Sequence, residues 1–316
     1  MSASSPEADA ARTSVAVYVC TYRRNGALRN MLDALTVSAK RAEHLADVAA
    51  VVVDDNPDGS ARDVVDECVG CFSLGIHYRH CGKQNISAAR NVGLAAAMEL
   101  AEWVAMTDDD CEPDADWLLA LLETQQRTGA DALTGPLVMR FPPDAPRWLR
   151  EEPFGLGEDD CHEDGARVLV AQTHNSMISS AWLRAHSEIR FCEELGVLGG
   201  EDMVFYRTAA RAGLRIHYAR DAVVHEMVPP HRATLRHQLR TQFWLGNSEY
   251  VTNTWSGQAS RLRMAARGGR RLVRAMRRPV VRVVRGQRPQ LRWFAASVLR
   301  ALGIIAGVVG VRVEHR

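Results

Sequence analysis

The sequence predicts an open α/β fold with a mainly parallel sheet flanked by helices. Short apolar runs rich in β-branched residues alternate with segments of helical periodicity, and each run stops at a cluster of polar residues. The runs lie at residues 15–20, 49–53, 76–79 and 103–106, and the third is the weakest. Ligands of such sheets collect at the carboxyl ends of the strands, so we expect the functional residues there.

Helices are indicated between these runs. After the first strand, leucine and methionine recur three and four residues apart, at Leu28, Met31, Leu32 and Leu35. A second helix is expected from about residue 61, after a stretch rich in turn formers, and an alanine-rich third helix over residues 87–100. Strand, helix and strand therefore alternate through the first third of the chain.

Three consecutive carboxylates, Asp108, Asp109 and Asp110, follow the strand at 103–106. Crowded carboxylates repel one another, and leaving them ionised in a cleft is costly unless a cation or hydrogen-bond donors compensate. Mg²⁺ and Mn²⁺ prefer oxygen ligands, and Mg²⁺ is commonly held by one or two carboxylates together with substrate phosphates. The spacing therefore suggests a metal and diphosphate site. A solvated acidic turn before a helix near Trp117 is the alternative, because acidic residues also suit a helix N-terminus.

The net charge of +1 conceals a strong asymmetry between the two ends of the chain. Residues 257–316 contain fifteen arginines, no lysine and one acidic residue, a net charge of +14, which leaves −13 for the rest. We expect residues 251–316 to form a basic amphipathic helical tail. Its uninterrupted apolar run, 301–311, is shorter than the approximately 20 residues that span a bilayer.

Arginines on one face and apolar residues on the other predict that this tail lies on an anionic membrane surface. A helical cap or an oligomer contact is the alternative. Binding of nucleic acid is not expected, because no recognised nucleic-acid module accompanies the arginines.

The N-terminus, residues 1–13, is polar and acidic and does not resemble a secretory signal, so we expect it to be disordered and the protein to be cytoplasmic, or peripheral on the inner face of the cell membrane. Seven cysteines without regular spacing agree with a reducing compartment. A zinc cluster over residues 68–81 is an alternative, although the spacing of its five candidate ligands matches no common zinc module. These are Cys68, Cys71, His77, His80 and Cys81.

The two commonest nucleotide cradles are missing, since the first strand is followed by no GxGxxG and the chain has no Walker lysine. Other groups must hold a nucleotide if one binds. Asp54 and Asp55 could accept hydrogen bonds from a base or ribose, and Tyr22 could cover a base. An ordinary turn remains the alternative for the two aspartates.

Six segments occur in order over residues 14–250, and together they resemble the family 2 glycosyltransferases with a GT-A fold: VCTYRRN, VVVDDNPDGS, NISAARNVG, MTDDDCEPDADWL, GGEDMVF and AVVHE. The resemblance implies a catalytic domain over 14–250. It also implies inverting transfer of a hexosyl or N-acetylhexosaminyl group from a nucleotide sugar, expected to be a UDP-sugar, to a hydroxyl acceptor, with Mn²⁺ or Mg²⁺ as the cofactor.

The resemblance also implies roles on the donor side. The base and ribose would be held by Thr21, Tyr22 and Asp55, with Asp54 beside them. Asn85 and Arg90 match the segment that closes over the nucleotide. Asp108 would lie towards the ribose and Asp110 would bind the metal, while Asp109 could be either a support or a ligand.

On the acceptor side, Asp202 resembles the catalytic base, with Glu201 beside it, and an acidic pair at a helix N-terminus is the alternative. His225 matches a histidine that can reach the metal or diphosphate, although a structural role is equally consistent with its place after a strand. Asn175 matches a segment that lines the sugar and acceptor site. Arg232 and Arg236 are four residues apart, which predicts that they lie on one face of a helix and contact phosphates. Residues 141–166 are expected to form a mobile loop near the acceptor.

The predicted function is single transfer of a sugar to a lipid-linked envelope precursor or a similar acceptor. A soluble enzyme that glycosylates a secondary metabolite is an alternative within the same class. A non-catalytic nucleotide-sugar-binding scaffold and a nucleotidyltransferase are alternatives from other classes.

Overall fold

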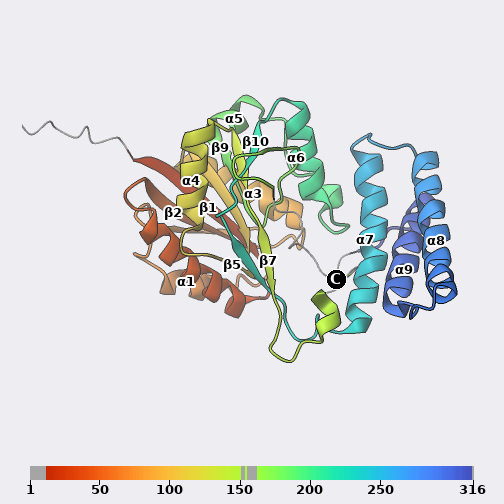
Figure 1. Ribbon diagram of the computed structural model, residues 1–316. Helices are drawn as coiled ribbons and strands as arrows, with labels where there is room; N and C mark the ends of the chain where they lie inside the picture. Colours follow the sequence, from red (N-terminus) through yellow and green to blue (C-terminus); the bar gives the residue numbers. More distant parts are fainter. Residues whose placement is uncertain (1–11, 151–153, 155–161, 315–316) are drawn as a thin grey trace, which may run out of the picture.

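The computed structural model describes residues 12–150, 154 and 162–314. The segment predicted to be disordered lies outside the described residues as far as residue 11, and so do residues 151–153 and 155–161 of the predicted acceptor loop. The α/β fold class and the helical tail are confirmed (Figure 1).

The main sheet has eight strands in the order β3-β2-β1-β4-β9-β6-β10-β8. The first four are parallel, β9 runs antiparallel to both β4 and β6, and β8 is an antiparallel edge strand. The strands are β1 (Thr13–Thr21), β2 (Ala46–Asp54), β3 (Ile76–His80), β4 (Trp103–Asp108), β6 (Ala132–Thr134), β8 (Arg167–Val168), β9 (Ser176–Ser179) and β10 (Ile216–Tyr218).

Helices cover both faces of this sheet, which explains why its central strands are apolar runs without alternation. Val17 of β1 faces a core with α1 (Asn25–Arg41), α2 (Arg62–Glu67) and α4 (Trp117–Thr128). Tyr18, the next residue, faces a second core with α3 (Ile86–Leu100), α5 (Ser180–Ala185) and α6 (Glu201–Arg211). The sequence expectation for the first three helices is therefore confirmed, with α2 shorter than its neighbours.

A second sheet of three strands extends the fold beside the acidic motif. Its order is β5 (Cys111–Pro113), β11 (Val224–Met227) and β7 (Leu137–Arg140). The strand β11 pairs antiparallel with β5, which follows Asp110 directly. Residues 224–227 are thereby brought next to the three aspartates although more than a hundred residues separate them in the chain.

The C-terminal part forms a bundle of three helices beside the α/β part (Figure 1). The helices are α7 (Leu235–Trp255), α8 (Arg261–Val284) and α9 (Leu291–Val308), and α9 packs against both others. A Cβ atom on Gly303 would lie 2.0 Å from the carbonyl oxygen of Phe243, and one on Gly246 would lie 2.1 Å from that of Arg300. The glycines therefore allow α7 and α9 to approach backbone to backbone. The tail was expected to start at residue 251. The helix α7 spans this position, because it runs from Leu235 to Trp255.

Within the described residues, α9 is the one helix that is long and apolar enough to cross a membrane by length and composition. It is longer than the apolar run 301–311 because the helix begins at Leu291 and includes Arg292 and Arg300. Its buried residues include Gly303 and Ile304, which pack against other helices of the bundle.

We predict that Gly303→Ala lowers the free energy of unfolding by about 1–3 kcal/mol, because the added methyl group forces α7 and α9 apart. Thermal or denaturant unfolding measures the change. Gly269→Ala in α8 is the matched control, since a Cβ there would meet nothing within 4 Å. It should leave stability unchanged or raise it by about 0.5–1 kcal/mol. Equal effects of the two substitutions would contradict the close contact.

Candidate active site

The polar residues after β1, β2 and β4 meet at one edge of the main sheet. The parallel register pairs Thr21 with Asp54 and Cys20 with Asp108, so the carboxyl ends of the three strands lie side by side. The candidate residues that the sequence placed at the ends of these strands are thus brought to one edge.

The middle aspartate of the acidic motif is engaged inside the protein. Asp109 is 4% exposed, and it accepts hydrogen bonds from Thr21 Oγ1 at 2.8 Å and from Arg24 Nη1 at 3.0 Å. Burial raises the pKa of Asp109 to about 6, although the charge of Arg24 opposes the shift. Of the two roles that the sequence left open for Asp109, this geometry favours support.

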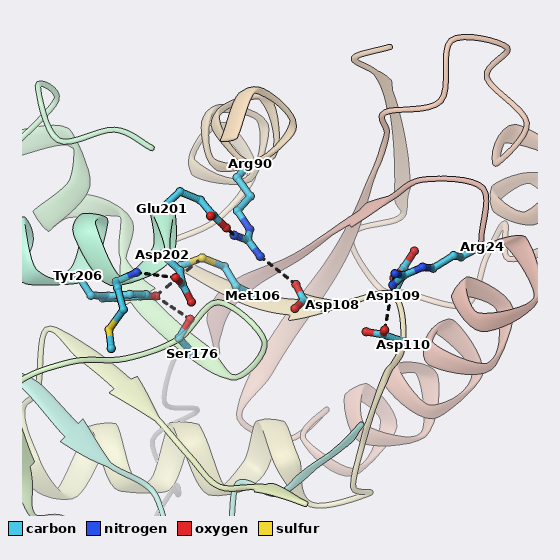
Figure 2. Close-up of polar contacts among 11 residues, drawn as sticks. Arg24, Arg90, Met106, Asp108, Asp109, Asp110, Ser176, Glu201, Asp202 and Tyr206 are labelled. Carbon is cyan, nitrogen blue, oxygen red and sulfur yellow. Dashed lines mark hydrogen bonds and ion pairs between the residues drawn. The ribbon is translucent and has the colours of Figure 1, made fainter. Parts of the chain in front are cut away.

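Asp110 lies at the mouth of the site. Its Oδ2 atom is 2.9 Å from Arg24 Nη1 and 3.2 Å from Arg232 Nη1 (Figure 2 shows the contact with Arg24). Two guanidinium groups therefore balance this carboxylate. Such groups also suit the phosphates of a ligand, since arginine binds phosphate in a bidentate manner.

On the nucleotide side, Asp55 joins the β2 turn to the loop before α3. Its Oδ1 atom accepts hydrogen bonds from the backbone amides of Lys83 at 2.9 Å and Gln84 at 3.0 Å. The hydroxyl of Tyr22 donates to Gln84 Oε1 at 3.1 Å, and the Tyr22 side chain is exposed. Three segments that the sequence assigned to a nucleotide therefore surround one place.

Two other residues from that assignment hold the local backbone instead. Asp54 is fully buried and accepts hydrogen bonds from the amides of Asn56 and Ala61 within its own turn. Asn85 caps α3 by accepting from the amide of Ala88, and its Nδ2 donates to the carbonyl of Glu193. Their side chains are thus used inside the fold, and direct contact of either with a nucleotide does not fit this geometry.

Arg90 connects the end of β4 to the start of α6. It is 7% exposed and lies between two carboxylates, forming an ion pair with Glu201 through Nη1 and another with Asp108 Oδ1 at 3.3 Å through Nη2 (Figure 2). Burial alone would lower the pKa of Arg90, but Glu201 and Asp108 raise it above its ordinary value. The helix-surface position considered for Arg90 is therefore excluded.

Glu201 and Asp202 begin α6, after the left-handed residue Gly200 at φ +88°. A Cβ atom at Gly200 would lie 2.3 Å from Thr252 Oγ1 in α7, so only glycine fits at this approach. Beside it, Trp244 Nε1 of α7 donates to the carbonyl of Leu198 at 3.1 Å. The bundle thereby supports the loop that carries Asp202.

Asp202 accepts a hydrogen bond from the backbone amide of Met203 at 2.6 Å. Figure 2 shows Asp202 on the same side of Arg90 as Glu201, with Asp109, Asp110 and Arg24 grouped on the far side. The two acidic sets therefore face the site from opposite ends.

His174 is a candidate that the sequence reasoning did not select. Burial lowers its pKa, and the charges of Asp108 and Asp202 act in the opposite direction. Its neighbour Asn175 was chosen instead. Asn175 is fully buried, accepts from Trp117 Nε1 at 2.8 Å, and donates to the carbonyl of Ala222 at 2.7 Å. Asn175 is therefore committed to the fold rather than to an acceptor.

The late strand shows the same one-residue difference. His225 contacts Asp114 Oδ1 at 2.7 Å and accepts from Arg140 Nε at 3.1 Å, and the structure does not bring it to Asp110. Glu226 lies on the other side of β11. Burial and the charge of Asp110 raise the pKa of Glu226 to about 7, and Arg232, 3.9 Å away, opposes the shift.

The two arginines predicted to share a helix face do not share a helix. Arg232 precedes α7, which begins at Leu235, whereas Arg236 is exposed in its first turn. Only Arg232 joins the acidic site, through its contacts with Asp110 and Glu226.

The residues at the mouth fit a hard divalent cation. Asp110 and Glu226 both lie near one Arg232 nitrogen, and carboxylate oxygens are the ligands that Mg²⁺ and Mn²⁺ prefer. Among residues 12–150, 154 and 162–314, no group of three or more His, Cys, Asp or Glu side chains could hold a metal. The protein would thus supply at most two such ligands and leave the others to phosphate and water, and the alternative zinc cluster near Cys68 is not formed.

A mainly parallel sheet of this order, with an acidic motif at the carboxyl end of β4, is similar to the GT-A fold. The family model for glycosyl transferase family 2 matches residues 16–187, which is more than half of the chain. The chain therefore belongs to glycosyltransferase family 2 and is a glycosyltransferase, as its motifs indicated.

Among its relatives, the succinoglycan biosynthesis protein ExoM of Rhizobium meliloti is 32% identical over 234 residues, which cover 73% of this chain and 72% of ExoM. The glucosyl-dolichyl phosphate glucuronosyltransferase of Haloferax volcanii is 27% identical over 256 residues, which cover 78% and 79%.

Solved structures of S. aureus TarS share the fold with a TM-score of 0.52. One TarS chain is 18% identical, and the match covers 74% of this chain and 40% of TarS. The complex of a shorter TarS chain with UDP-GlcNAc is 16% identical, with 76% and 71% covered.

We predict that Arg90→Met lowers the free energy of unfolding by about 3–5 kcal/mol, because it leaves the buried Glu201 carboxylate without its cation. Denaturant unfolding measures the loss. Arg29→Met, which breaks the exposed ion pair with Glu67, is the control and should change stability little. Equal stability of the two variants would contradict a buried ion pair between Arg90 and Glu201.

Proposed function

We propose that this glycosyltransferase moves a sugar from a UDP-sugar to a hydroxyl of a lipid-linked saccharide, with a divalent cation and with inversion at the sugar carbon. The observation that supports this most directly is the separation of two acidic sets by Arg90. A donor bound at one set and an acceptor bound at the other would meet between them. Single transfer fits better than polymerisation, because Gln242-Phe243-Trp244 only loosely matches the Gln-x-x-Arg-Trp motif of processive members.

On the donor side, the exposed ring of Tyr22 would cover the base and Asp55 would accept hydrogen bonds from the base or ribose. Asp108 would lie towards the ribose, where Arg90 holds it. One of the TarS structures is a complex with UDP-GlcNAc, which supports a UDP-sugar for this chain.

Asp110 and Glu226 would hold Mn²⁺ or Mg²⁺. When bound, the cation would neutralise the charge that develops on the departing diphosphate. Arg24 and Arg232 balance Asp110 in the structure, and they would turn towards the phosphates of the donor once it binds.

On the acceptor side, Asp202 would take the proton of the acceptor hydroxyl. General base catalysis of this kind contributes on the order of 10²- to 10⁴-fold in rate. Glu201 is bound to Arg90 and is placed to orient the start of α6, which leaves Asp202 as the carboxylate for proton transfer. A base on one face of the sugar and the leaving group on the other would give inversion.

The name of one relative supports an acceptor on a lipid carrier, because the Haloferax volcanii enzyme is named for a glucosyl-dolichyl phosphate. ExoM is named for succinoglycan biosynthesis, which supports a saccharide product. With an acceptor of this kind, the enzyme would work on the cytoplasmic side of the membrane, held there by its basic tail.

We predict that Asp202→Asn lowers sugar transfer on the order of 10²- to 10⁴-fold while the donor Kd stays unchanged, because the substitution removes only the base. Asp110→Asn should instead weaken binding of the donor in the presence of Mn²⁺ and abolish its sensitivity to EDTA. Calorimetry with a panel of nucleotide sugars, followed by transfer assays with polyprenyl-linked saccharides, measures both effects.

Asp116→Asn, an exposed acid at the start of α4, is the matched control and should alter neither quantity. Unchanged product formation by Asp202→Asn would contradict the proposed base. Release of pyrophosphate from a nucleoside triphosphate would instead identify a nucleotidyltransferase.

A further inference from the structure

The helix α8 has an unusual division of its faces. It carries nine arginines and no acidic residue among 24 residues. The side that packs into the bundle is made of small or flexible residues, because its buried positions are Met264, Gly268 and Ala275. The larger aliphatic side chains of α8 therefore lie outside its buried face.

Those side chains form a stripe on the exposed side. They recur at multiples of three and four residues, and they are between 54% and 82% exposed: Leu262, Val273, Met276, Val280 and Val284. A contiguous exposed apolar stripe marks an interaction site, because removing apolar surface from water is favourable. Figure 1 shows α8 on the outer side of the bundle, away from the main sheet.

A row of arginines follows the same helix beside this stripe. Its exposed members are Arg263, Arg267, Arg270, Arg274, Arg277 and Arg285. Arg267 contacts Glu249, an acid that also pairs with Arg271 and Arg300.

At the C-terminal end of the row, the surface forms a hollow of about 400 Å³. Its lining includes Arg274, Arg277, Arg278, Arg282 and Arg285. A hollow with this lining suits phosphate oxygens, because guanidinium groups form charge-assisted hydrogen bonds with them.

Building on the proposed function, in which the basic tail holds the enzyme at a membrane, we propose that this face of α8 is a membrane-docking surface for anionic phospholipid. The aliphatic stripe enters the boundary between head groups and acyl chains, and the arginine row contacts the lipid phosphates. The helix then lies in the plane of the membrane, as amphipathic helices with a basic polar face do. Each arginine near an anionic surface adds attraction, which long aliphatic stems reinforce by lying along the apolar layer.

Two alternative arrangements, a dimer formed through α8 and insertion of α9 into a bilayer, fit less well. A second copy of this chain would bring two arginine rows together, which their like charges oppose. Insertion of α9 across the bilayer would require its separation from the bundle, where Gly303 lies against the backbone of Phe243 and Ile304 is buried.

This docking would also place the catalytic part. The first turn of α9, which follows α8, contacts the predicted acceptor loop, because Arg292 stacks over the ring of Trp148 with 5.4 Å to its centroid. Trp148 lies in the 3₁₀ turn Arg147–Arg150, and it lines a second hollow of about 400 Å³ together with Gln290 and Leu291. A membrane under α8 therefore lies beside the loop that would receive a lipid-linked acceptor.

The test is flotation of the full chain with vesicles of phosphatidylcholine alone and of phosphatidylcholine with phosphatidylglycerol. We expect binding to the anionic vesicles only, and weaker binding as salt is raised. Replacing Arg270, Arg274 and Arg277 by Gln should weaken the partition on the order of 100-fold, because each guanidinium near an anionic surface contributes its own attraction. Replacing Val273, Val280 and Val284 by Ser should also release the protein, although no charge is removed.

Matched control variants carry the same substitutions on the α/β part of the protein. The exposed residues Val37, Val69 and Leu169 are replaced by Ser, and Arg167, Arg190 and Arg220 by Gln. These variants should bind vesicles as the parent chain does. All substituted positions are exposed, so we expect every variant to keep the bundle intact. Thermal unfolding of each variant checks this.

Three results would overturn the proposal. In the first, both α8 variants bind anionic vesicles as tightly as the controls. In the second, the protein resists extraction by alkaline carbonate, which would indicate insertion of α9. In the third, the chain ignores anionic vesicles but retards single-stranded RNA, which would assign the arginine row to nucleic acid.

Discussion

The buried guanidinium of Arg90 is the constraint on which the site depends. Its two nitrogens bind Asp108, at the end of β4, and Glu201, at the start of α6. Removing water from the buried charges of Arg90 and Glu201 is costly, and their close pairing compensates for it, so Glu201 cannot move away without leaving an unpaired buried charge. Asp108, whose side chain is 35% exposed, is the outer partner of Arg90. Arg90 thereby joins the end of β4 to the start of α6. Under the proposed function, this connection would hold donor and acceptor in the orientation that displacement chemistry needs.

The helical bundle is part of the same construction. Gly199 and Gly200 lie in left-handed conformations against Trp244 and Thr252 of α7, so the loop that carries Glu201 and Asp202 rests on the first helix of the bundle. The glycines between α7 and α9 then connect this support to the outer helix α8.

At two places the residue chosen from the sequence is used by the fold while its neighbour carries the perturbed pKa: Asn175 beside His174, and His225 beside Glu226. In β11 the reason is that successive residues of a strand point to opposite sides. His174 lies instead in a turn before β9, whose side-chain directions follow no regular period. Asp54 and Asn85 hold the local backbone in the structure, because a polar side chain after a strand can satisfy the backbone as readily as it can bind a ligand.

The order of the amino acids was enough to predict the alternation of strands and helices, because strands buried on both faces must be apolar runs and their polar ends must gather at one edge. It was also enough for the acidic motif, the pair at 201–202 and the strongly basic tail, because these are matters of composition and order. Packing in three dimensions settled which side chains enter the site and which hold the fold, and that the tail forms a bundle with one helix face uncovered. Those outcomes depend on contacts between residues far apart in the chain, and no local pattern contains them.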